Sequence, residues 1–138
     1  MPTGTTDRQL LERLAVAHDG LRRRIEWLAA SPPPAAVLDI GAAVVFHGVL
    51  EEHWLHASDT LLEPATVTQL AIEHARLADD LDLLGSLYDS HPDSPDLGPL
   101  ADALLTRLRA HITRDDRVFY QSIPRLRGTP VRRSCSTG

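Results

Sequence analysis

Six side chains of the kinds that bind metal ions interrupt the apolar pattern of this chain. They are His18, His47, Glu51, His74, His111 and Asp115. Imidazole and carboxylate groups without a thiolate suit iron, manganese or zinc. Zinc usually takes only four ligands, whereas six candidates, including two carboxylates able to bridge, fit two ions better. The residue types therefore predict a metal site that holds two ions.

The spacing of these residues places them on the inward faces of helices. His18, for example, takes the position between Leu14 and Leu21 in an apolar stripe with helical period. Two of the histidines are followed by a carboxylate four residues later, which sets both groups about 40° apart on one helix face. Buried carboxylates cost kilocalories unless they are neutralised, and no Arg or Lys is expected to face inward. A bound cation is the remaining source of positive charge.

Proline clusters divide the chain into four helical segments that would position these side chains. The segments are predicted at 6–30, 35–62, 65–88 and 97–122, each with apolar residues at helical spacing and no strand-like alternation. Short connections between helices of similar length predict an all-α, up-down-up-down antiparallel four-helix bundle. We expect one domain over residues 1–123 and an Arg-rich, disordered tail over 124–138.

The predicted helix ends also place the histidines at one level of this bundle. His18 lies 12 residues before the end of the first segment, and His47 lies 12 residues after the start of the second. His74 lies 14 residues before the end of the third segment, and His111 lies 14 after the start of the fourth. We therefore expect all four imidazoles in one layer.

Composition narrows the class of protein. The 138 residues carry 14 basic and 19 acidic side chains, a net charge of −5, which argues against nucleic acid as a main partner. No stretch predicts a membrane span or a secretory signal, so we expect a cytoplasmic protein that does not engage a membrane. The single cysteine, Cys135, excludes a Cys-rich metal site.

Four motifs in order resemble the hemerythrin-like family, also called the HHE cation-binding domain. They are His18-Asp19, His47-x-x-x-Glu51-Glu52, Glu73-His74, and His111-x-x-x-Asp115-Asp116 followed by Phe119-Tyr120, and they span about residues 7–123. The resemblance implies a non-haem centre of two iron ions, bridged by an oxo or hydroxo group and by carboxylates. It implies O2, peroxide, nitric oxide or iron itself as the small ligand. The four histidines would be terminal ligands, and Glu51 and Asp115 would bridge.

Two departures from the family pattern affect this assignment. Oxygen-carrying hemerythrins have a second histidine on the third helix, four residues before the retained one, and here that position is Leu70. The loss leaves an open position or one that Glu73 fills, and it favours reaction with O2 or peroxide over pure oxygen carriage. Asp115 is the better candidate bridge because it is central on the apolar face. The carriers place an Asp five residues after their histidine, which keeps Asp116 as the alternative.

The expected function is to bind or activate O2 or peroxide at a di-iron centre. Sensing of iron, oxygen or nitric oxide without turnover is one alternative, and a di-iron oxidase acting on an organic substrate is another. A metal-free bundle with a satisfied polar layer is the third. Whether the chain is an enzyme stays open: the sequence singles out no catalytic residue and no protein partner.

Other polar and aromatic residues have simpler interpretations. Trp27, Trp54 and Tyr120 are expected to pack in the core or between helices, with a hydrogen bond from Tyr120 towards the metal as an alternative. His53, His56 and His91 are expected at the surface. Five leucines, Leu14, Leu21, Leu70, Leu77 and Leu108, are expected to keep the pocket dry.

Overall fold

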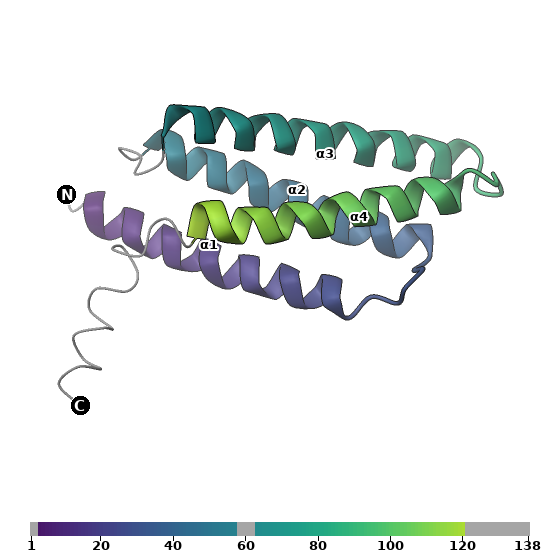
Figure 1. The fold of residues 1–138 in the computed structure, drawn as a ribbon, viewed down its shortest axis with the longest axis horizontal. Helices are drawn as coiled ribbons and strands as arrows, with labels where there is room; N and C mark the ends of the chain where they lie inside the picture. The colour runs from purple at the N-terminus through teal and green to yellow at the C-terminus, as the bar shows by residue number, and fades with distance from the viewer. Residues whose placement is uncertain (1–2, 58–62, 121–138) are drawn as a thin grey trace.

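Four long helices pack side by side in the computed structural model, which describes residues 3–57 and 63–120 (Figure 1). They are α1 (Thr3–Glu26), α2 (Pro34–Ala57), α3 (Pro64–Ser90) and α4 (Leu97–Asp115). A single π-helical turn, η1 (Asp116–Tyr120), continues α4. The described ranges contain no strand, and the all-α helical bundle is confirmed. The proposed tail, 124–138, lies outside them.

Two helix starts differ from the predicted ones because of proline, and one helix ends earlier than predicted. Helices α2 and α3 begin on Pro34 and Pro64, one residue earlier than predicted, because the first helical position has no N–H bond to lose. Helix α1 ends at Glu26 rather than at residue 30. After it, the Trp27 amide still donates to the Arg23 carbonyl (3.0 Å), and the Leu28 amide donates to Ile25 in a tighter turn (3.2 Å). The chain then reaches the proline run that starts α2.

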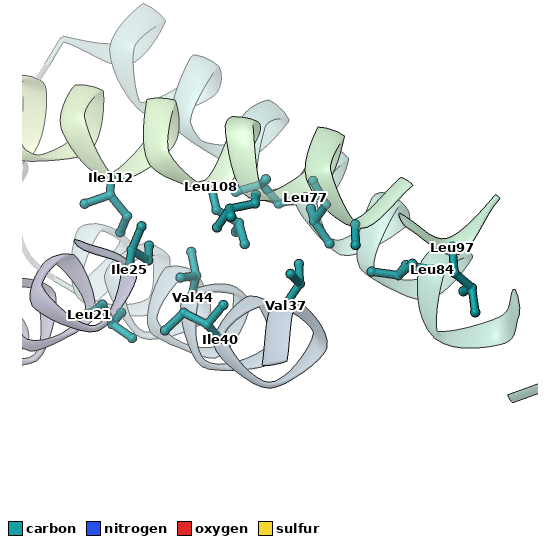
Figure 2. Packing of buried hydrophobic residues seen from close by; sticks show 13 residues of the cluster. Leu21, Ile25, Val37, Ile40, Val44, Leu77, Leu84, Leu97, Leu108 and Ile112 are labelled. Atoms are coloured by element: carbon teal, nitrogen blue, oxygen red, sulfur yellow. The ribbon is translucent and has the colours of Figure 1, made fainter. Parts of the chain in front are cut away.

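The apolar core consists of two clusters. The larger one joins residues of all four helices, including Leu21, Val44, Leu77 and Leu108, whose side chains point towards one another (Figure 2). The smaller one contains Leu11, Leu14, Trp54, Leu55, Leu70 and Tyr120. Along each helix, with η1 counted as the end of α4, residues of one cluster are followed by residues of the other. The polar side chains described below lie where the two clusters meet. The bundle therefore has a polar layer between two apolar ones.

The two tryptophans have different environments. Trp54 is 1% exposed in the smaller cluster, as predicted. The packing predicted for Trp27 is wrong, because this side chain is 87% exposed. It follows the last residue of α1, where the helical period that would direct it inward no longer applies. His53 and His91 are exposed, as predicted, and the side chain of His56 lies outside the part for which we describe contacts.

Helix α2 is apolar on more than one side. By length and composition, Pro34–Leu55, with a mean hydropathy of 1.5, is the one span in the described part of the chain that is apolar enough to cross a membrane. The same helix carries His47 and Glu51, both buried against the other helices. Helix α2 therefore contributes both apolar and potential metal-ligating side chains to the bundle interior.

Candidate metal centre

The structure brings all six predicted residues into the bundle interior. Each of them is at most 6% exposed, and every one of the four helices contributes at least one. They form two groups, in each of which the potential ligand atoms lie within 4.8 Å of one another. The first group is His18, His47, Glu51 and Asp115, and the second is Glu51, His74 and His111. Glu51 belongs to both groups.

The two carboxylate oxygens of Glu51 face different histidines. Oε2 lies 3.1 Å from Nε2 of His47, and Oε1 lies 3.3 Å from Nε2 of His74. Glu51 is 0% exposed, so this orientation is fixed by packing rather than by solvent. A carboxylate with one oxygen in each of two ligand groups has the arrangement needed to bridge two cations.

Asp115 occupies a comparable position on the opposite helix. Its Oδ2 atom lies 3.6 Å from Nδ1 of His18 and 4.0 Å from Nε2 of His111, one histidine of each group. The alternative, Asp116, has Oδ1 3.7 Å from Nε2 of His18, but its side chain is 39% exposed. Burial therefore favours Asp115 as the inner carboxylate and places Asp116 at the edge of the site.

Carboxylates outside the centre orient two of the imidazoles. Nδ1 of His74 lies 2.6 Å from Oε2 of Glu52, and Nδ1 of His111 lies 3.1 Å from Oε1 of Glu73. A carboxylate that accepts from one ring nitrogen fixes the tautomer and directs the other nitrogen towards a metal. Glu73 is also 2.9 Å from Nη1 of Arg114. It is thus held on the outer side of His111 and does not fill the position that Leu70 leaves without a donor.

Gly48 lets α2 approach the ring of His74. A Cβ atom at this position would stand 2.9 Å from Cδ2, 3.0 Å from Cγ and 3.1 Å from Nε2 of that imidazole. A Cβ atom added at Gly20 of α1, in contrast, would meet nothing within 4 Å. The absence of a side chain at residue 48 is therefore part of the geometry of the centre.

Several buried polar atoms of the site have no hydrogen-bond partner among the described residues. They are both ring nitrogens of His18, Nδ1 of His47, Oε1 of Glu51, Nε2 of His74 and both oxygens of Asp115. Buried polar groups are normally satisfied, and each unsatisfied one costs about 1–3 kcal/mol. Their concentration at one level, on nitrogen and carboxylate oxygen, fits cation binding.

The pKa shifts of the buried carboxyl and imidazole groups also fit cation binding. Burial, together with the neighbouring Glu51 carboxylate, raises the pKa of Asp115 to about 11. Burial also acts to raise the pKa of Glu51, but the adjacent imidazoles of His47 and His74 outweigh it and hold this pKa well below its usual value. Burial lowers the pKa of His18 and of His111, which favours the neutral imidazole that binds metals.

Tyr120 is the site residue whose role the sequence left undecided. Its side chain is 2% exposed, and its hydroxyl donates to Oε2 of Glu51 (2.7 Å) while lying 2.9 Å from Nε2 of His47. Its ring centroid is 4.4 Å from that of His18. Five residues of α-helix would turn Tyr120 about 140° away from Asp115. The π-helical turn η1 changes this phase and directs the phenol inward.

A pocket of about 550 Å³ lies between α3 and α4 beside the centre. It reaches His111 and Glu73 and is lined by charged residues of both signs, including Arg76, Asp80 and Arg114. Solvent and small solutes can therefore approach the outer side of the His111 imidazole.

Comparisons with protein-family models, with curated proteins and with solved structures find no match to this chain.

Proposed function

We propose that this chain is a non-haem di-iron protein that binds or activates O2 or peroxide inside its helical bundle. The observation that carries the proposal is the membership of Glu51 in both ligand groups. One carboxylate with each oxygen 3.1–3.3 Å from a different imidazole is arranged for two adjacent cations rather than one. Asp115, which lies between His18 and His111, also supports two cations.

The donor set is compatible with iron, which the proposed redox chemistry requires. Four imidazoles and two carboxylates, with no thiolate, suit iron, manganese or zinc. If both carboxylates bridge, each ion has two imidazoles and two carboxylate oxygens from the protein. Octahedral metals then retain positions for small molecules. Bound iron would supply the electrons for O2 or peroxide chemistry, which zinc does not.

The surrounding residues determine what reaches the centre. Leu14, Leu70 and Trp54 cover one side of the polar layer, and the larger apolar cluster covers the other. These walls exclude bulk water, which strengthens every electrostatic interaction inside. The pocket at Glu73 and His111 is the side from which a small polar molecule reaches the imidazoles.

Tyr120 is placed to hold a proton beside the bridging carboxylate. Its hydroxyl donates to Oε2 of Glu51, and the Leu14 carbonyl lies 3.3 Å from the same oxygen of Tyr120. Burial raises the pKa of Tyr120, so the phenol stays protonated. We therefore assign it the role of a hydrogen-bond donor to the centre.

Sensing of a metal or small ligand without turnover is the second candidate function. It is favoured by the unsatisfied atoms of His18 and Asp115, because a cation that satisfies them stabilises the folded state. A sensor would show a large rise in melting temperature with iron and no consumption of O2 or peroxide.

Elemental analysis and an absorption spectrum of the purified protein test the proposal. We expect about two iron ions per chain and a charge-transfer band that responds to azide and to peroxide. His47→Ala should lose iron, whereas the matched control His53→Ala, at an exposed histidine of the same helix, should keep it. One zinc ion per chain, or equal iron content in the two variants, would refute the proposal.

A further inference from the structure

Among the described residues, none covers the centre of the outward side of α2, which is apolar. The exposed residues of this helix, where side chains are described, are Ala35, Asp39, Ala42, Phe46, Val49 and His53. We call this set the α2 outer face. Phe46 is 63% and Val49 57% exposed. The alternating steps of four and three residues form the seam that a second helix packs against in a coiled coil.

The outer face of α4 has a different composition. Between Asp39 and His53, the α2 outer face carries no charge, whereas exposed positions of α4 include Arg107, Arg109 and Arg114. A helix that is apolar on every side is normally buried on every side. Only 39% of the apolar α2 window is buried within this chain. The sequence of α2 therefore suits one partner inside the bundle and another outside it.

The two ends of the face carry complementary hydrogen-bonding groups, a carboxylate and an imidazole, at equal distances from its centre. Asp39 lies seven residues before Phe46, and His53 lies seven residues after it. If two α2 helices cross antiparallel with a two-fold axis at Phe46, each Asp39 meets His53 of the second copy. Arg24 lies 3.1 Å from Oδ2 of Asp39, and the Asp39 side chain is 80% exposed, so its carboxylate is accessible to a second copy. The two-fold arrangement thus gives the polar groups at both ends of the face a partner in the second copy.

We propose that the α2 outer face is a homodimer interface in which a second copy of this chain packs its own α2 antiparallel, with Phe46 at the two-fold axis. The face extends about 27 Å from Ala35 to His53, at 1.5 Å per residue. One helix pair of this length lies at the low end of specific interfaces, below about 1,200 Å² in total. The expected result is a monomer–dimer equilibrium in the micromolar range. The proposal does not depend on the metal centre, because His47 and Glu51 face the opposite side of α2.

Cysteine cross-linking tests the position of the axis. In a Cys135→Ser background, Phe46→Cys places the two thiols next to each other, and mild oxidation should give a disulfide-linked dimer. The control is His53→Cys, whose two copies would stand about 21 Å apart, beyond the reach of a disulfide. No cross-linking of Phe46→Cys, or equal cross-linking at both positions, overturns the proposed geometry.

Sedimentation velocity over a range of protein concentrations tests the interface itself. We expect Phe46→Glu to raise the dissociation constant by about 10-fold or more, because it buries a charge at the axis. Leu83→Glu, at a residue of α3 that is 57% exposed, is the matched control and should leave the constant unchanged. Asp39→His and His53→Asp should each weaken the dimer, and together they should restore it.

Three outcomes overturn the proposal. They are a monomeric mass at every concentration, equal effects of the Phe46 and Leu83 substitutions, and failure of the Asp39 and His53 exchange to restore the dimer. Capture of the chain by neutral phosphatidylcholine vesicles without self-association would assign the face to lipid instead. Circular dichroism of each variant verifies that these surface substitutions leave the bundle folded.

Discussion

Replacing Gly48 with alanine should remove one metal ion from the centre while leaving the bundle folded. The new Cβ would stand 2.9–3.1 Å from three atoms of the His74 imidazole, and ordinary contact begins at 3.4 Å. The ring must therefore move by about 0.5 Å. It is tied to Glu52 through Nδ1 at 2.6 Å, so it cannot turn freely to recover its place. Metal–ligand distances tolerate only about 0.2 Å, and disturbing a ligand's orientation costs about 10–100-fold in affinity.

The same substitution has opposing effects on the metal-free protein. Alanine gains about 1 kcal/mol over glycine in a helix interior, and the crowding of His74 costs about 1–3 kcal/mol. The free energy of unfolding should therefore change by no more than about 2 kcal/mol. Gly20→Ala, which meets nothing within 4 Å, is the matched control and should gain stability without losing metal.

Metal titration followed by elemental analysis and thermal unfolding measures both effects. We expect Gly48→Ala to retain the ion held by the His18 and His47 group and to lose the one that needs His74. If Gly48→Ala binds two ions as tightly as the parent and Gly20→Ala, the assignment of His74 as a ligand fails.

Three further predictions concern the same layer. His74→Leu should release at least one iron ion, measured by elemental analysis, and should destabilise the bundle little beyond the lost metal; full iron content would contradict the ligand assignment. Because the pKa of Asp115 is raised from 3.8 to about 11, the folded metal-free chain keeps a proton between these values that the unfolded chain loses. Its free energy of unfolding should therefore fall with rising pH in this window, by up to about 1.4 kcal/mol per pH unit. Urea unfolding of the parent chain and of Asp115→Asn from pH 7 to 9 measures this slope, which should be flatter in the variant. Tyr120→Phe should lower the stability of the metal-free protein by about 1–2 kcal/mol, because Glu51 loses a donor, and should leave the metal content unchanged; unaltered unfolding curves would show that this hydrogen bond does not contribute.

The inward placement of the candidate ligands could be predicted because it depends only on the period of each helix. His18, His74 and Asp115 stand in apolar stripes, and the structure buries all three. The same reasoning predicted the helical bundle. The predicted starts of α2 and α3 were one residue too late, because Pro34 and Pro64 were treated as helix breakers rather than as suitable first residues of a helix.

Features that depend on contacts between helices were not accessible in this way. Glu52 and Glu73 accept hydrogen bonds from histidines on neighbouring helices, and the rotation of each helix about its own axis decides these pairings. The packing of Tyr120 was predicted, but its hydrogen bond towards the centre was only the alternative, because a regular α-helix turns this residue away from Asp115 and no sequence rule predicts the π-helical turn. Trp27 was assigned to packing because α1 was expected to continue to residue 30, whereas it ends at Glu26.

The division of the core into two apolar clusters has a consequence for how the chain opens. Without bound cations, the polar layer between the clusters contains unsatisfied groups and does not stabilise the fold. Each apolar cluster must then stabilise its own end of the bundle. Counted over the described residues, the larger cluster has 13 buried members and the smaller one six, so the larger one should protect its amides from hydrogen exchange longer. Cations that join His18 and His47 to His74 and His111 would couple the two ends into one cooperative unit.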